Sequence, residues 1–194
     1  MKQILVINGG TTYPSYEEYF KGLQNLELKY ERLLAHQDWK PTLSALFPDD
    51  DILLPNFPNR QNAQYNEWCI YFEKLLPFLR DDFILTGHSL GAIFLAKYLH
   101  EHQLEKKAKK LILVAAPYDD EEDESLGGFK LTSATGLENS ASEVHLFFSK
   151  DDPVVNISEY PKFQRDLPGA TFHILDGYGH FNKPEFPELI ELLK

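Results

Sequence analysis

Short apolar runs alternate along this chain with longer stretches whose apolar residues recur at helical spacing. The short runs are nearly continuous in apolar residues instead of alternating with polar ones, which is typical of parallel strands that are covered on both faces. They lie at residues 3–7, 51–54, 82–86, 110–115, 143–149 and 171–175. We therefore expect each run to be a buried strand, and the sheet to contain about six strands.

The stretches between the strands predict helices. They cover residues 16–34 as one or two helices, and then 39–47, 63–80, 89–102, 157–166 and 186–193. Pro77 should shorten or kink the end of the helix at 63–80, because proline lacks the N–H that a helix interior needs. Alternating strands and helices indicate βαβ units with right-handed crossovers. The predicted fold class is α/β, a compact single domain over residues 1–194 with a mostly parallel sheet flanked by helices on both faces.

Residues 117–142 are the irregular part of the pattern. They contain an acidic run at 119–124, followed by Gly127-Gly128. We expect an excursion from the strand ends, either a solvated acidic loop or a minimal lid that would disfavour anionic substrates. Consecutive carboxylates lack the alternating spacing of a calcium loop, so a cation site is the weakest alternative.

The charge balance excludes some classes of partner. The 194 residues include 19 basic and 30 acidic side chains, for a formal net charge of −11. Nucleic acids and anionic membrane surfaces both attract clustered Lys and Arg, so neither is an expected partner. The sole cysteine, Cys69, permits no internal disulfide, and the apolar run at the N-terminus is too short for a signal peptide. We expect a cytoplasmic protein.

Residues 83–92 carry the first chemical motif. They read as a strand, a tight turn and the start of a helix, with Gly87-His88-Ser89-Leu90-Gly91 at the turn. This is G-x-S-x-G in its strand–turn–helix context, and it resembles the nucleophile elbow of α/β-hydrolases. Such a turn exposes the serine hydroxyl on strained backbone, and a side chain at either glycine would collide with neighbouring backbone. We expect Ser89 to be a nucleophile; the alternative is a glycine-rich turn in which Ser89 only caps the helix.

A serine hydroxyl needs a general base, and the base needs an acid that orients it. In α/β-hydrolases the acid and then the histidine follow the serine along the chain. Asp152 comes shortly after the strand at 143–149 and begins an Asp-Pro pair that favours a turn, so we expect it to be the acid. We prefer it to Asp151. Asp119 and Asp120, which follow the preceding strand, are the rival acids.

His180 is the expected base. It follows the last strand, at 171–175, in a loop with two glycines that free the loop to bend the imidazole over the sheet edge. His145 and His173 lie within predicted strands, where a structural role is expected, and His88 is expected to pack beside the turn. The order Ser89, Asp152, His180 matches the order that the fold requires.

An oxyanion intermediate needs two backbone donors. The N–H of Leu90 stands at a helix N-terminus directly after Ser89, which makes it one candidate. The other should come from the glycine-containing loop after the first strand, at residues 8–12, where we expect the N–H of Gly10, with Thr11 as the alternative.

Several motifs together carry a family resemblance. They are Ile7-Asn8-Gly9-Gly10, Leu54-Pro55-Asn56, the pentapeptide around Ser89, Ser149-Lys150-Asp151-Asp152-Pro153-Val154-Val155 and Gly179-His180-Phe181. In this order and spacing they resemble the small α/β-hydrolases related to the retinoblastoma-binding serine hydrolase family. The resemblance implies a six-stranded α/β-hydrolase fold with little or no lid, and Ser89, Asp152 and His180 as a catalytic triad.

Two features depart from that family pattern. Asn8-Gly9 stands where many hydrolases have His-Gly, which leaves the first-loop oxyanion donor open. The chain also contains no L-x-C-x-E motif, so a retinoblastoma-type partner is not carried over.

The predicted function is a serine hydrolase that cleaves a small ester or amide through an acyl-enzyme on Ser89, with no cofactor and no metal. The alternatives are a non-catalytic binding protein on a hydrolase scaffold and an acyltransferase. Dehalogenases and epoxide hydrolases need a carboxylate nucleophile where Ser89 stands, which argues against both of these reactions.

Overall fold

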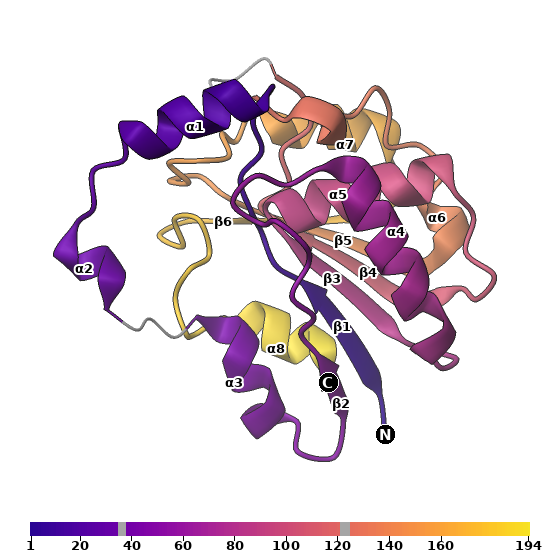
Figure 1. The fold of residues 1–194 in the computed structure, drawn as a ribbon. Helices are drawn as coiled ribbons and strands as arrows, with labels where there is room; N and C mark the ends of the chain where they lie inside the picture. The colour runs from indigo at the N-terminus through magenta and orange to yellow at the C-terminus, as the bar shows by residue number, and fades with distance from the viewer. Residues whose placement is uncertain (35–37, 121–124) are drawn as a thin grey trace.

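A computed structural model describes residues 1–34, 38–120 and 125–194 of the chain. The strands of these residues form a six-stranded sheet in the order β2-β1-β3-β4-β5-β6 (Figure 1). They are β1 (Gln3–Ile7), β2 (Asp51–Leu53), β3 (Ile84–His88), β4 (Ala108–Val114), β5 (Ala141–Ser149) and β6 (Thr171–Leu175). Every neighbouring pair runs parallel. The predicted fold class is confirmed.

Helices cover both faces of this sheet. One face carries α4 (Tyr65–Leu75), α5 (Leu90–Glu101), α6 (Leu137–Ser140) and α7 (Glu159–Asp166), and the other carries α3 (Trp39–Leu46) and α8 (Pro187–Leu193). Figure 1 shows the first group above the sheet and the second group below it. The core is therefore split by the sheet into two apolar layers.

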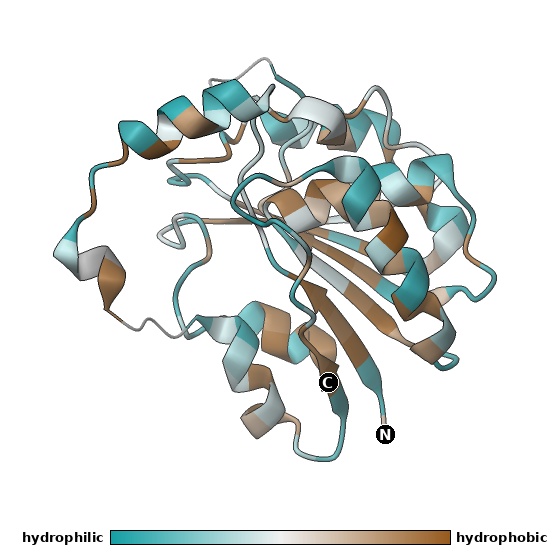
Figure 2. Cartoon of the chain, viewed as in Figure 1, coloured by the Kyte–Doolittle hydropathy of each residue, from teal (hydrophilic) through white to brown (hydrophobic). Residues whose placement is uncertain are grey.

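The strand β1 shows why its sequence is continuously apolar. Ile4 and Val6 point into the layer under α3 and α8, whereas Leu5 and Ile7 point into the layer under α4 and α5. All four side chains are fully buried, because successive side chains of a strand face opposite sides and both sides are covered here. Figure 2 shows the resulting apolar band through the centre of the molecule.

The observed element boundaries differ from the predicted ones for local reasons. β3 begins at Ile84 instead of residue 82, because Asp82 has a left-handed backbone with φ of 61° and belongs to a turn. β4 begins earlier than predicted, since Ala108 already pairs with Ala141 of β5. Pro77 does shorten α4, which ends at Leu75 and continues as a 3-10 turn, η1 (Leu76–Phe78).

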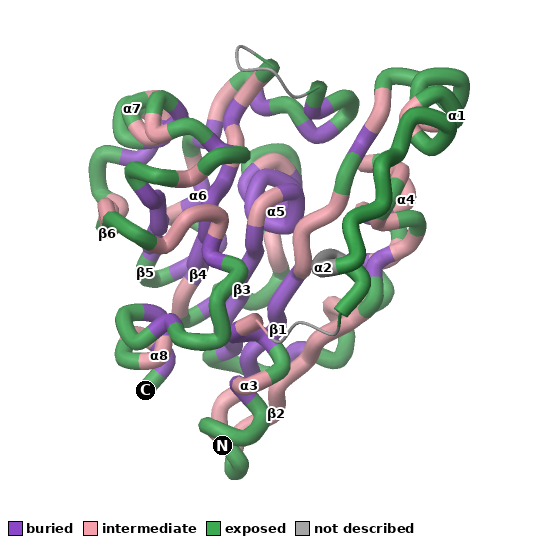
Figure 3. Tube along the Cα trace, turned by 90° about the vertical axis from the view of Figure 1, so that its left-hand side faces the viewer, coloured by how far each residue is buried: buried purple, intermediate pink, exposed green. Residues whose placement is uncertain are grey.

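The stretch at 16–34 forms two short helices, α1 (Tyr16–Gln24) and α2 (Tyr30–Leu33). Ser15 caps α1 by accepting a hydrogen bond from the N–H of Glu18 at 3.2 Å. α1 buries none of its residues, and both helices lie on the outside of the molecule (Figure 3). They contribute little to the two core layers.

The segment 117–142, predicted to be an irregular excursion, is partly ordered and partly buried in the core. It contains a 3-10 turn, η2 (Gly127–Phe129), and the short helix α6. Tyr118, Leu126 and Phe129 are buried in the layer under α4 and α5. Residues 121–124 of the acidic run lie outside the described residues, so the structure says nothing of that part of the predicted lid.

The strand order creates one special position at the carboxyl edge of the sheet. From β1 the chain proceeds to β2 on one side, and β3 to β6 build the sheet on the other side. Open α/β sheets bind ligands at such a switch point, outside the carboxyl ends of the strands. The loop after β1 holds Gly9 and Gly10, and the turn after β3 holds Ser89, so the two predicted halves of the site begin on adjacent strands. No helix in the described parts of the chain has the length and apolarity needed to cross a membrane.

Candidate active site

Ser89 occupies a strained turn between β3 and α5. Its backbone has φ of 56° and ψ of −123°, a conformation that side-chain-bearing residues rarely adopt and that costs about 1–3 kcal/mol. The Ser89 N–H donates to the carbonyl of Val114 on β4 at 2.9 Å, which fixes the turn to the sheet. The α-helix begins at the next residue, Leu90, so the Ser89 side chain stands at a helix N-terminus.

The glycines around Ser89 are required by close backbone contacts. A Cβ on Gly91 would lie 2.4 Å from the carbonyl oxygen of Ile7, and one on Gly87 would lie 2.5 Å from the carbonyl oxygen of Gly91. Both distances are shorter than real Cβ contacts, so a side chain at Gly91 would push α5 away from β1, and one at Gly87 would push α5 away from β3. A Cβ on Gly9 would lie 3.4 Å from the hydroxyl oxygen of Ser89, so the first loop passes directly beside the hydroxyl.

The structure brings His180 and Asp152 together. The imidazole Nδ1 of His180 lies 2.9 Å from Oδ2 and 3.1 Å from Oδ1 of Asp152. The Asp152 side chain is only 1% exposed, and its Oδ1 also accepts the N–H groups of Val154 and Val155. These bonds fix the direction of the carboxylate, and through it the direction of the imidazole.

Asp151, which we did not choose as the acid, has a different role. Its Oδ1 accepts the hydroxyl of Ser149 and the N–H groups of Gly177 and Gly179, both in the loop that carries His180. The Ser149 and Gly179 hydrogen bonds lower the pKa of Asp151, which therefore stays ionised. One aspartate orients the imidazole and its neighbour anchors the loop.

The rival acids lie in other interactions. Asp119 forms an ion pair with Lys162 of α7 at 2.6 Å, and Asp120 accepts the N–H of Leu126 at 2.7 Å. Among the described residues, neither is hydrogen-bonded to a histidine.

His88 forms a hydrogen bond to the loop that carries His180. Its Nε2 lies 2.8 Å from the carbonyl oxygen of His180, so Nε2 carries the proton and donates it. Its Nδ1 is then an acceptor, and the ammonium group of Lys40 lies 3.5 Å away. Trp39 adds a second bond from α3, since its indole N–H donates to the carbonyl of Phe181 at 3.0 Å. The expectation that His88 packs beside the turn omitted this hydrogen-bonding role.

Burial and charge keep His88 neutral. Burial lowers its pKa well below the usual value, and the nearby charge of Lys40 lowers it further. In the unfolded chain the same side chain titrates near pH 6.5. His88 therefore contributes stability that is present above about pH 6.5 and is lost as the pH falls below it, because only the unfolded state then gains the proton.

This linkage predicts a measurable pH dependence. Between pH 7.5 and 5.5, the wild type should lose about 1.4 kcal/mol more unfolding free energy than His88→Gln, whose amide can still donate to the His180 carbonyl. Urea unfolding at the two pH values measures the difference. The exposed His102 supplies the matched control, His102→Gln, which should follow the wild type. Equal losses for the wild type and His88→Gln would contradict the assignment.

Two backbone N–H groups near Ser89 are unused. In the described part of the chain, neither the N–H of Gly10 nor that of Leu90 has a hydrogen-bond partner. The N–H of Thr11, by contrast, donates to the carbonyl of Arg60 at 2.8 Å. Of the two first-loop alternatives, Gly10 is therefore the one whose N–H remains available to a ligand.

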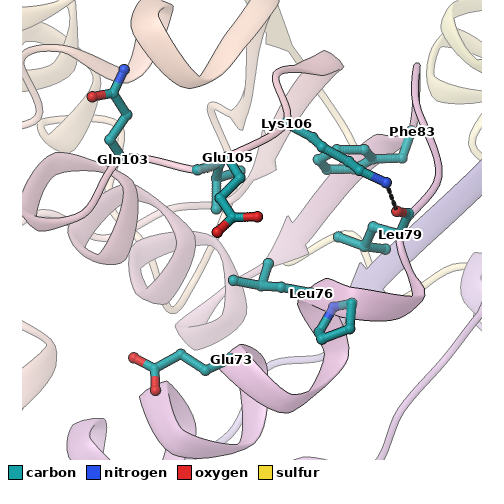
Figure 4. A pocket seen from close by; sticks show the side chains of 9 residues that line it. Glu73, Leu76, Leu79, Phe83, Gln103, Glu105 and Lys106 are labelled. Atoms are coloured by element: carbon teal, nitrogen blue, oxygen red, sulfur yellow. Dashed lines mark hydrogen bonds between the residues drawn. The ribbon is translucent and has the colours of Figure 1, made fainter.

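Ser89 and His180 line the same cavity, of about 330 Å³, together with Gly9, Gly10, Lys40 and Arg60. The Ser89 hydroxyl makes no hydrogen bond within the described residues. Catalytic hydrogen bonds are often long before a substrate is bound. A cavity of about 550 Å³ lies elsewhere, between α4, η1 and residues 103–106 (Figure 4). It is lined by residues such as Glu73, Phe83 and Lys106 and contains none of the predicted site residues.

Sequence reasoning missed Lys40 and Arg60. Lys40 is the second residue of α3, directly after Trp39, and Arg60 lies in a polar loop between β2 and α4. Neither lies in a motif, so a single sequence offered no signal for them. Their position depends on how α3 and that loop fold over the edge of the sheet.

Comparisons with known proteins identify the family. A family model described as serine hydrolase matches residues 35–189. The chain is 30% identical to serine hydrolase RBBP9 of Rattus norvegicus over 151 residues, which is 76% of this chain and 78% of that protein.

Solved structures show the same fold. The ydeN gene product of B. subtilis superposes with a TM-score of 0.76 at 20% identity, covering 100% of this chain and 97% of that one. A putative yden-like hydrolase of Pectobacterium atrosepticum gives a TM-score of 0.69 at 15% identity, covering 99% of this chain and 89% of that one. With the family match over most of its length, the chain belongs to the serine hydrolase family and has an α/β-hydrolase fold.

Proposed function

We propose that this hydrolase cleaves a small ester or amide through an acyl-enzyme on Ser89, with Ser89, Asp152 and His180 as its triad. The observation that carries the proposal is the contact of His180 Nδ1 with Asp152 at 2.9 Å, at the cavity that Ser89 also lines. A histidine held by a buried carboxylate at Nδ1 presents its other nitrogen as a base. The Ser89 hydroxyl, on a backbone turn with positive φ, lines the same cavity as this histidine.

The reaction proceeds in two steps. In the first, His180 takes the proton of Ser89 as Oγ attacks the substrate carbonyl, and then gives it to the leaving alcohol or amine. Asp152 stabilises the imidazolium that forms between these transfers. In the second, water attacks the acyl-enzyme with His180 as base, which releases the acid and restores Ser89.

The N–H groups of Gly10 and Leu90 stabilise the oxyanion in both steps. Each is free of other partners among the described residues, and they come from adjacent strand ends. Removing one donor of an oxyanion hole typically costs about 10²–10³ in kcat, so this pair supplies a large share of the catalysis.

Labelling with a fluorophosphonate probe tests the proposal. The probe reacts with an activated serine, so the wild type should be labelled and Ser89→Ala should not. The exposed Ser44 on α3 gives the matched control, because Ser44→Ala removes a hydroxyl of the same kind outside the cavity and should be labelled like the wild type. A wild type that is folded by circular dichroism and stays unlabelled would contradict the proposal and favour a non-catalytic binding protein.

Product analysis distinguishes hydrolysis from acyl transfer. With a p-nitrophenyl ester and added alcohol, a hydrolase should release mainly the free acid, whereas an acyltransferase should form the new ester. The cytoplasmic location and the absence of nucleic-acid and membrane partners, expected from the composition, stay predictions.

A further inference from the structure

The space around Ser89 has two parts of different chemistry. The cavity of about 330 Å³ that contains His180 is polar, and Lys40 and Arg60 contribute to its wall. A second cavity, of about 200 Å³, meets it at Ser89 and is lined largely by apolar side chains that include Leu90, Leu126 and Val155. A substrate attacked by Ser89 would thus place one end in a polar space and the other in an apolar space.

The position of His180 decides which end goes where, on the basis of the proposed function. The general acid must reach the leaving group to protonate it. His180 lines the polar cavity and is not among the residues that line the apolar one. The leaving alcohol or amine therefore lies in the polar cavity, and the acyl group lies in the apolar cavity.

Among the residues that the structure describes, one positive charge of the polar cavity has no carboxylate partner. Lys40 is buried and forms an ion pair with Asp38 at 2.6 Å, and Asp38 is the acidic residue among the described residues of the cavity wall. Arg60 donates its Nε–H to the carbonyl of Gly9 at 2.8 Å, which leaves its two terminal nitrogens. Within the described residues these nitrogens have no carboxylate partner.

The pKa values of its neighbours support the placement of the Arg60 charge. The pKa of Lys40 is lowered mainly by burial, and Arg60 is among the charges that act on it. The pKa of His88 is lowered by burial first and also by Lys40 and Arg60. Arg60, Lys40 and His88 line the same cavity, and the chain thus places a cationic side chain beside Ser89 although its net charge is −11.

We propose that the leaving group of the natural substrate carries an anionic group, a carboxylate, that binds to Arg60. The planar guanidinium pairs with two carboxylate oxygens at once, through the two terminal nitrogens that its bond to Gly9 leaves. The substrate class is then an acyl ester of a hydroxy acid or an acyl amide of an amino acid. The bond from the acyl carbon to the leaving oxygen or nitrogen breaks, and His180 protonates that leaving atom. One water molecule then hydrolyses the acyl-enzyme and releases the carboxylic acid.

This assignment differs from what the acidic segment suggests by composition. A lid rich in carboxylates would disfavour anionic substrates, but residues 121–124 lie outside the described residues. The cavity wall next to Ser89 is the part that a bound leaving group would contact, and the charge there that lacks a partner among the described residues is positive.

A matched pair of chromogenic esters tests the proposal. 4-Nitrophenyl butyrate and 3-carboxy-4-nitrophenyl butyrate differ only by a carboxylate on the leaving group. We compare kcat/KM for the two esters after dividing each by the rate of its spontaneous hydrolysis. The wild type should prefer the anionic ester, and Arg60→Gln should lower that preference about tenfold, as expected for the loss of a charge-assisted hydrogen bond.

The control variant is Arg80→Gln. Arg80 is an exposed arginine paired with Asp51, outside the cavity, and its substitution should leave the preference at the wild-type value. If Arg60→Gln does not fold, inhibition of the wild type replaces it: benzoate should inhibit hydrolysis of the neutral ester more strongly than benzamide does.

The outcomes separate this proposal from the proposed function. Hydrolysis of both esters with no preference in the wild type, or a preference that Arg60→Gln leaves unchanged, overturns the carboxylate site alone. Equal inhibition by benzoate and benzamide does the same. Hydrolysis of neither ester, together with no labelling of Ser89, overturns the proposed function and this assignment with it.

Discussion

Replacing His180 with alanine should lower kcat for a p-nitrophenyl ester by roughly 10⁶-fold, the largest effect that we expect on activity. Of the two histidines among the described residues of the cavity wall, His180 is the one whose Nδ1 contacts a carboxylate, that of Asp152 at 2.9 Å. Steady-state kinetics of the purified variant measure the effect. His102→Ala removes an exposed imidazole from α5's C-terminal end and should retain the wild-type kcat.

Two further variants show whether the three residues act as a unit. Asp152→Asn should lower kcat by about 10⁴-fold, because an amide cannot hold the imidazole in the tautomer that accepts the serine proton. The double variant Ser89→Ala/His180→Ala should be no slower than either single variant, since each alone already removes the nucleophilic step. Additive losses in the double variant would show that Ser89 and His180 work independently and would contradict the triad.

Replacing Gly91 with alanine should destabilise the fold by about 3 kcal/mol, at the upper end of the cost of overpacking. The added Cβ would lie 2.4 Å from the carbonyl oxygen of Ile7 and 2.7 Å from that of Asn8. Both contacts are with backbone of the adjacent strand and its loop, so no side chain can rotate away to relieve them. Urea unfolding of the wild type and the variant measures the change.

Gly169 provides the matched control for Gly91. A Cβ at Gly169 would have no atom within 4 Å, and the backbone there is not left-handed. Gly169→Ala should therefore change the unfolding free energy by less than about 1 kcal/mol. A Gly91→Ala variant as stable as Gly169→Ala would show that α5 can move away from β1. It would contradict the inference that this contact requires a glycine.

The strands and helices were largely predictable because their signals are local. The apolar runs at β1 and β6 predicted the observed bounds, since burial on both faces leaves a continuous apolar run that needs no partner to be recognised. Pro77 predicted the end of α4 for the same reason, because a missing N–H acts within its own helix. The boundaries of β3 and β4 were less accurate, because they depend on a left-handed turn at Asp82 and on pairing with β5.

The candidate site was predictable where chain order carried the information. Asp152 and His180 were predicted because the fold places an acid and a histidine after successive strands, and the structure brings their side chains into contact. The choice between Gly10 and Thr11 could not be made, since it depends on a hydrogen bond from Thr11 to the distant Arg60. Lys40 and Arg60 were missed for the same reason, because only tertiary packing brings them to the cavity that Ser89 lines.

The left-handed backbone of Ser89 has a consequence for how this protein tolerates change. With φ of 56°, the position suits glycine better than serine, so replacement of the proposed nucleophile by glycine relieves the backbone there. Random mutation and selection for thermal resistance alone would therefore favour the loss of the reactive hydroxyl. A serine at this position persists only while selection acts on turnover. At Ser89, a gain in stability would therefore come with a loss of activity.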